Sequence, residues 1–99
     1  MAEDDLKRDL GVVVAVAYAD PFKKALNMWK KKDRSLFSQI VEHTDKIIQN
    51  PFLGKPLRYS YKNNRRIHIG SFVLVYEFHD KTLRFIDFDH HDKIYKKYK

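Results

Sequence analysis

The side chains best suited to chemistry lie in the C-terminal third of the chain, in two short segments. The first reads RRIHIG at residues 65–70, and the second reads HHDKIY at residues 90–95. Arginine binds phosphate through a rigid fork of N–H donors and keeps its charge, whereas histidine exchanges a proton near neutral pH. Together with tyrosine, these are the residue types that cleave RNA without a metal.

Alternation along residues 65–69 predicts which of these groups meet. Alternate side chains of a strand point to the same face, so Arg66 and His68 should share a face about 7 Å apart, with Ile67 and Ile69 facing the core. Metal-free cleavage needs a base for the 2′-hydroxyl proton, a cation for the phosphoryl oxygens and an acid for the leaving oxygen. Arg66 suits the cation's role, and His68 suits either the base or the acid. The alternative for both is a solvated strand face.

Basic residues flank this strand and suggest a track for an RNA backbone. Arg65 has the opposite phase, so we expect it to position the RNA or rRNA backbone, or simply to be exposed. Lys55, Arg58 and Lys62 are expected to extend the phosphate track, although solvated loops explain them nearly as well.

The segment that begins with His90, His91 and Asp92 invites a metal site, but we expect none. Neighbouring residues of a strand point to opposite faces, so the two histidines should diverge, and no third ligand follows at helical spacing. Only one histidine should face the cleft, and no cofactor is expected. Asp87 and Asp89 either orient a histidine and raise its pKa or lie on the solvent side.

The rest of the chain supplies elements that position these groups. A valine-rich run at residues 11–18 predicts a buried first strand. Asp20 is a suitable N-cap for a helix, with the following proline at the first helical position. A second helix should begin at Asp33 or Ser35 and end at the Asn-Pro pair of residues 50–51.

After residue 54 the apolar spacing becomes two, which is typical of strands. Four strands are predicted, at residues 57–61, 65–69, 72–78 and 82–89. The fold class is therefore expected to be α+β, with two N-terminal helices packed on one face of a mostly antiparallel sheet of four to five strands. The other face would be open. Six aromatic residues are assigned to the core: Phe22, Trp29, Phe37, Phe72, Tyr76 and Phe85.

Composition indicates one domain with a polyanionic partner. The 99 residues, 43% of them hydrophobic, can bury a single core, with residues 1–10 as a polar extension and residues 11–99 as the domain. The absence of cysteine excludes disulfides and thiolate zinc sites. No apolar run is long enough to span a membrane, so we expect a cytoplasmic protein.

Residues 55–99 hold eleven Lys or Arg against five Asp or Glu, which favours nucleic acid as a partner over a merely solvated surface.

Several segments, taken in order, resemble the RelE/ParE toxin superfamily, in its RelE-type branch. They are NP at residues 50–51, GKPLR at 54–58, RRIHIG at 65–70, FVLVYE at 72–77 and HHDKIY at 90–95. The resemblance implies a toxin of a type II toxin–antitoxin pair. It also implies a metal-independent endoribonuclease that cleaves ribosome-bound mRNA, contacts rRNA and is silenced by a cognate antitoxin.

The resemblance also implies roles for residues near the C-terminus. It assigns His91 to the leaving group or the phosphate, with His90 as the register alternative, and Tyr95 to stacking on a base. A structural hydrogen bond explains His91 about as well. The best-known RelE-type sites carry lysines where this chain has Arg66 and His68, so the division of acid and base work can differ here.

Two other classes of function remain open. One is a gyrase-directed toxin of the ParE type, which has the same fold without a nuclease site. The other is a non-catalytic RNA-binding or ribosome-binding module that uses the same basic face.

Overall fold

The computed structural model describes residues 12–57 and 63–98 of the chain. The predicted extension at residues 1–10, Arg58 and Lys62 therefore lie outside the described residues. The elements are β1 Ala15–Tyr18, α2 Asp20–Lys32, α3 Arg34–Gln49, β2 Lys55–Pro56, β3 Asn64–Ile69, β4 Phe72–His79, β5 Thr82–His90 and α4 His91–Lys97.

The strands form one mixed sheet in the order β1-β5-β4-β3-β2. β2 to β5 are antiparallel neighbours, and β1 runs parallel to β5 at the edge. The α+β prediction is thus confirmed, and β3, β4 and β5 match the predicted strands to within one residue at each end. The strand predicted at residues 57–61 is instead the two-residue β2, which ends before Leu57, and residues 58–61 lie outside the described part.

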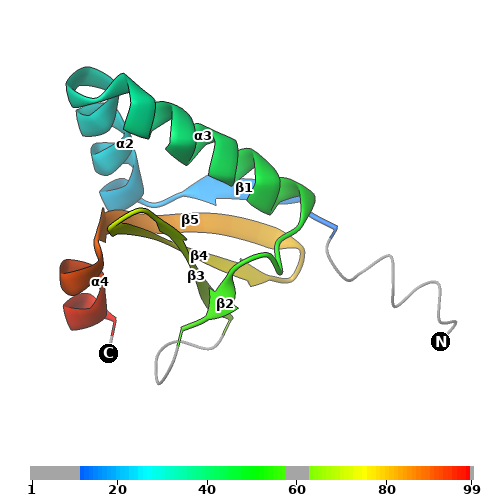
Figure 1. The fold of residues 1–99 in the computed structure, drawn as a ribbon. Coiled ribbons are helices and arrows are strands. Elements are labelled where there is room, and N and C mark those ends of the chain that lie inside the picture. Colours follow the sequence, from blue (N-terminus) through cyan, green and yellow to red (C-terminus); the bar gives the residue numbers. More distant parts are fainter. Residues whose placement is uncertain (1–11, 58–62, 99) are drawn as a thin grey trace, which may run out of the picture.

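The N-terminal helices α2 and α3 cover one face of this sheet (Figure 1). Phe22 of α2 and Ile40 and Ile47 of α3 are buried in one cluster with Leu74 and Phe85 of the sheet. Burial of these side chains provides the main stabilisation of the fold. The predicted pair of N-terminal helices on one face of the sheet is therefore confirmed, and the two helices form a hairpin.

The predicted start of one helix agrees with the structure, and the predicted start of the other does not. The Oδ1 atom of Asp33 accepts a hydrogen bond from the backbone N–H of Leu36 at 3.1 Å, which confirms Asp33 as the N-cap of α3. The prediction for Asp20 is wrong, because Ala19 is the N-cap and Asp20 lies inside the first turn of α2. A carboxylate in the first turn still favours the positive end of the helix dipole.

Strand β1 is not the buried strand that the valine-rich run predicted. Three of its four residues are exposed, including Val16 at 37% and Tyr18 at 44%. Among the described residues, β1 pairs only with β5, so it is an edge strand of the sheet. Apolar runs of this length do not distinguish a central strand from an edge strand.

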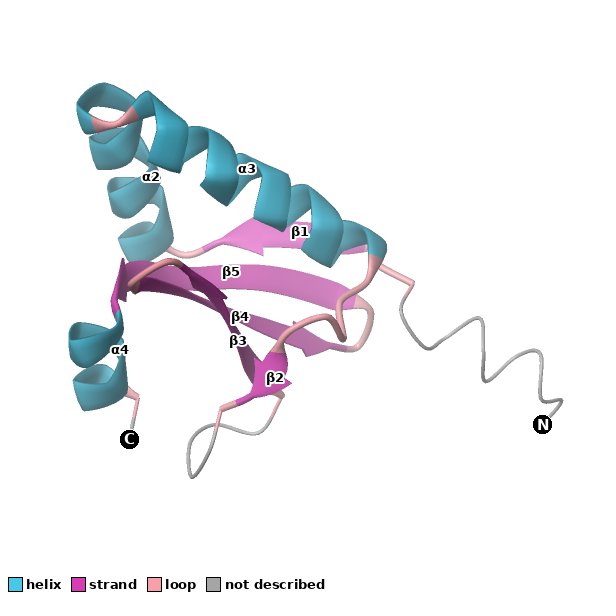
Figure 2. Ribbon diagram, viewed as in Figure 1, coloured by secondary structure: helices cyan, strands magenta, loops and turns pink. Residues whose placement is uncertain are grey.

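The second face of the sheet is not open along its whole length, because the C-terminal helix α4 packs there (Figure 2). Ile94 of α4 is fully buried in a second cluster with Leu57, Val73 and Val75. The sequence did not predict this helix, since seven residues with one buried apolar side chain give no helical periodicity.

Most of the predicted core aromatic residues are confirmed. Phe22, Tyr76 and Phe85 are fully buried, and Trp29 and Phe72 pack partly buried against the same cluster. The assignment of Phe37 is wrong: this half-buried ring lines a surface pocket with Lys30, Arg34 and Ser38. Among the described residues, no helix is long and apolar enough to span a membrane.

Candidate functional site

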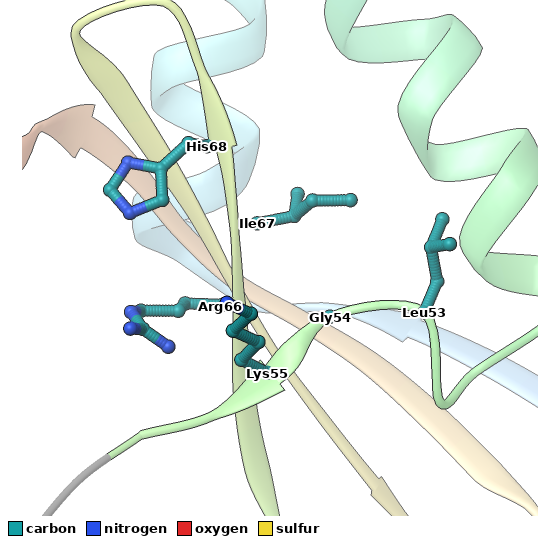
Figure 3. Close-up of a pocket in the computed structure, with 6 residues that line it drawn as sticks. All are labelled: Leu53, Gly54, Lys55, Arg66, Ile67 and His68. Atoms are coloured by element: carbon teal, nitrogen blue, oxygen red, sulfur yellow. The ribbon is translucent and has the colours of Figure 1, made fainter.

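The site is built on strand β3, where alternation places Arg66 and His68 on the face that α4 covers. Figure 3 shows both side chains on one side of the strand and Ile67 on the other. Ile67 and Ile69 pack with the core under the helices. The predicted face assignment is therefore confirmed.

Tyr95 of α4 joins these two groups. The Nε–H of Arg66 donates to the Tyr95 hydroxyl oxygen at 3.0 Å, and that oxygen lies 3.2 Å from His68 Nε2. A hydroxyl can accept from arginine while it donates to a neutral imidazole or accepts from a protonated one. The Tyr95 hydroxyl therefore links the two side chains.

The guanidinium of Arg66 keeps most of its hydrogen-bonding capacity available. Besides Tyr95, it donates through Nη1 to the carbonyl oxygen of Pro56 at 3.3 Å. Among the described residues, no carboxylate forms an ion pair with it. An arginine held in place by neutral oxygens is suited to bind a phosphate.

A pocket of about 230 Å³ opens beside these residues. It is lined by Leu53, Gly54, Lys55, Arg66, Ile67 and His68 (Figure 3). Because β2 pairs only with Arg65 and Arg66, the edge of β3 beyond Arg66 has no strand partner among the described residues. Lys55 lies opposite Arg66 in the pairing of β2 with β3.

The wall of this pocket depends on a close approach at Gly54. A Cβ atom there would lie 2.6 Å from the carbonyl oxygen of Arg66 and 2.9 Å from the Tyr76 ring. The Tyr76 hydroxyl accepts from the backbone N–H of Gly54 and donates to the carbonyl oxygen of Pro51, both at 2.8 Å. Burial raises the pKa of Tyr76, while the Gly54 hydrogen bond and the charge of Arg65 act in the opposite direction.

Arg65 lies on the face opposite to Arg66, as predicted, and contacts this same loop. Its Nη1 donates to the carbonyl oxygen of Gly54 at 2.6 Å, and its guanidinium lies 5.0 Å from the centre of the Phe52 ring. Arg65 therefore holds the pocket wall, a structural role that the sequence did not indicate.

The two histidines at the end of β5 do not diverge. His90 ends the strand and His91 begins α4, so the strand rule stops applying between them. Their ring centres are 4.4 Å apart, and Asp92 approaches both: its Oδ1 is 2.9 Å from His91 Nδ1 and its Oδ2 is 3.7 Å from His90 Nδ1. The expectation that the rings point to opposite faces is wrong.

His91 also shares a helix face with Tyr95, since residues four apart on a helix lie one above the other. The resemblance assigned both residues to the site, but the sequence did not predict the helix that relates them. Among the described residues, His91 contacts Asp92 and the ring of His90, and no contact with Arg66 or His68 is found. His90 packs edge-on against Phe72, with ring centres 6.0 Å apart.

Asp87 and Asp89 anchor α4, and among the described residues neither carboxylate contacts a histidine ring. Lys97 donates to Asp87 at 3.1 Å and to Asp89 at 3.4 Å, and the Tyr98 hydroxyl donates to the buried Asp87 at 3.0 Å. Partial burial alone lowers the pKa of Lys97, but the hydrogen bond and charge of Asp87, assisted by Asp89, raise it overall. These contacts fix the end of the helix that presents Tyr95.

Comparisons with known proteins agree with this architecture. The family model for the ParE toxin of the type II toxin–antitoxin system parDE matches residues 16–95. A protein of Methanocaldococcus jannaschii named "Putative toxin RelE4" is 43% identical over 79 residues, a match that covers 77% of this chain and 84% of that protein.

Solved structures show the same fold at low sequence identity. A chain of the toxin–antitoxin complex RelBE2 from Mycobacterium tuberculosis has a TM-score of 0.66 at 21% identity, over 84% of this chain and 97% of that one. YafQ from E. coli has a TM-score of 0.64 at 23% identity, over 81% and 96%. The family match spans both segments of the site, and the chain thus belongs to the RelE/ParE family of toxins of type II toxin–antitoxin systems.

Proposed function

We propose that this toxin is a metal-independent endoribonuclease that cleaves ribosome-bound mRNA and thereby inhibits translation. The observation that carries the proposal is the contact of Arg66 and His68 with one tyrosine hydroxyl, at 3.0 and 3.2 Å, beside an open pocket. A fixed cation and a proton-exchanging group on one strand face are what phosphodiester cleavage requires.

We assign the steps of the proposed reaction as follows. A base removes the 2′-hydroxyl proton, the 2′-oxygen attacks the phosphorus atom, and the P–O bond to the 5′-oxygen breaks as an acid protonates that oxygen. The products are a 2′,3′-cyclic phosphate and a 5′-hydroxyl. Arg66 stabilises the charge on the phosphoryl oxygens. His68 and His91 supply the acid and the base between them, and Tyr95 positions Arg66 and His68 and stacks on a base.

The proposed partners are mRNA, the ribosome and a cognate antitoxin. A net charge of +7 favours association with polyanions such as rRNA and with an acidic protein segment. The structural neighbour RelBE2 was solved as a toxin–antitoxin complex, which supports an antitoxin for this chain as well. Lys55 and His90, together with the undescribed Arg58 and Lys62, remain proposed contacts of the RNA backbone.

The test is induction of the toxin without its antitoxin, followed by mapping of mRNA ends on ribosomes. Arg66→Ala should abolish most cleavage, whereas Arg34→Ala, which removes an exposed arginine of α3 outside the site, should not. Purified toxin should cut ribosome-bound mRNA after chelation of transition metals, with magnesium restored to keep the ribosomes intact. Loss of cleavage that only a transition metal restores would contradict the proposal.

The match to the ParE family model makes gyrase the second candidate target. A supercoiling assay with DNA gyrase separates the two functions. Inhibition of gyrase by both wild type and Arg66→Ala, without mRNA cleavage, would support the ParE-type activity. Arrest of translation with intact mRNA would instead support a non-catalytic ribosome-binding module.

A further inference from the structure

We infer that His90, His91 and Asp92 form a binding site for Zn²⁺, and that an ion held there inhibits the toxin by occupying His91. The inhibitory part rests on the proposed function, whereas the binding part does not. Nitrogen and oxygen ligands from two histidines and one aspartate suit Zn²⁺ and leave a position for water.

The strand-to-helix junction creates this arrangement. One potential ligand atom from each of the three residues lies within 4.8 Å of the others. A tetrahedral zinc ion with bonds of about 2.0–2.2 Å needs its ligand atoms about 3.3–3.6 Å apart, so small side-chain rotations complete the site. The side chains of His90, His91 and Asp92 are 41%, 44% and 68% exposed, which leaves room for these rotations.

The existing contacts are ones that an ion can replace. The Asp92 carboxylate already approaches both imidazoles, with Oδ1 2.9 Å from His91 Nδ1 and Oδ2 3.7 Å from His90 Nδ1. The bond from the Asp92 backbone N–H to His90 Nδ1 is long, at 3.4 Å, so an ion can compete for this nitrogen. Zn²⁺ binds neutral imidazole, and it would take the place of the proton shared between His91 and Asp92.

The net positive charge of the protein disfavours nonspecific binding of cations. A protein with a net charge of +7 repels cations in general, so stoichiometric binding must come from direct ligand bonds.

His79 and Asp80 provide a matched control, because they form a similar exposed pair, with His79 Nε2 3.4 Å from Asp80 Oδ2. Among the described residues, this pair has no third potential ligand close enough to form a group of three.

Binding is tested by calorimetric titration of ZnCl₂ into the untagged, full-length toxin without RNA. We expect one equivalent to bind to the wild type. His90→Gln, His91→Gln and Asp92→Asn should each weaken the affinity at least about tenfold, since loss of even an outer-shell partner costs about 10–100-fold. His79→Gln should match the wild type. Wild-type affinity in the three ligand variants, or an equal loss in His79→Gln, would overturn the site.

Inhibition is tested by measuring mRNA cleavage with ZnCl₂ and with chelator, each variant being compared with itself. Wild type and His79→Gln should lose activity in zinc, whereas the fractional loss in Asp92→Asn should be much smaller. Equal fractional losses in all three proteins would overturn the inhibitory role. Zinc binding without any cleavage would refute the nuclease proposal but not the zinc site. Cleavage without zinc binding would refute the zinc site but not the nuclease proposal.

Discussion

Replacement of Tyr95 by phenylalanine tests the proposed network most directly, because it removes one hydroxyl group and leaves the ring. That oxygen is 3.0 Å from Arg66 Nε and 3.2 Å from His68 Nε2. Both groups lose their shared partner in the variant, while the buried Ile94 still holds α4 against the sheet. The change therefore loosens the site without removing its helix.

The expected loss can be estimated from the hydrogen bond to the charged guanidinium. Such bonds contribute about 1.5–3 kcal/mol. Tyr95 is 37% exposed, so water compensates in part and the lower value applies. Since about 1.4 kcal/mol corresponds to a factor of ten in rate, Tyr95→Phe should reduce cleavage about tenfold. A direct general acid or base would cost about 10²–10⁴-fold, so the size of the loss separates positioning from proton transfer.

The assay is single-turnover cleavage of mRNA on purified ribosomes. Tyr18→Phe is the matched control, because Tyr18 is 44% exposed and lies on β1, outside the site. In an Arg66→Ala background, Tyr95→Phe should cost less than it does alone, because the two residues act through one contact. Wild-type rates in Tyr95→Phe, or equal losses in both backgrounds, would refute the network.

Further substitutions test the site and its supports. Arg66→Ala should slow cleavage by about 10²-fold or more, and Arg66→Lys should recover only part of it because a point charge does not replace the fork; equal rates in these proteins would show that Arg66 is not needed. Tyr76→Phe should lower the free energy of unfolding by about 1–3 kcal/mol, seen in urea titrations, since it leaves Gly54 N–H without its buried partner. Burial raises the pKa of Tyr76 in the folded state, so the contribution of its neutral hydroxyl to the free energy of unfolding is complete below pH 10 and is lost as the pH rises through the folded pKa. The free energy of unfolding should therefore fall above pH 10, and it should fall less in Tyr76→Phe. Lys97→Met should lower the free energy of unfolding by about 1–2 kcal/mol, because the buried Asp87 loses its ammonium partner; an unchanged melting temperature would show that this ion pair does not hold α4.

Much of the fold and part of the site are local properties of the sequence. The period of two along residues 64–69 decides that Arg66 and His68 share a face, whatever covers it. The Asp33 cap and the apolar stripes of α2 and α3 likewise depend on neighbours within a few residues. For these reasons the helical hairpin, strands β3 to β5 and the faces of Arg66 and Arg65 were predictable.

The tertiary structure decided what depends on contacts between distant segments. Tyr95 meets Arg66 and His68 only because Ile94 docks a short helix on the sheet, and one buried side chain gives no periodic signal. Arg65 became a support of the pocket wall because Gly54, eleven residues earlier, lies against its strand. Strand alternation would place the rings of His90 and His91 on opposite faces. Because the strand gives way to a helix between these residues, the ring centres instead lie 4.4 Å apart. Alternation holds only while the strand continues, and the end of a strand is set by what packs against it.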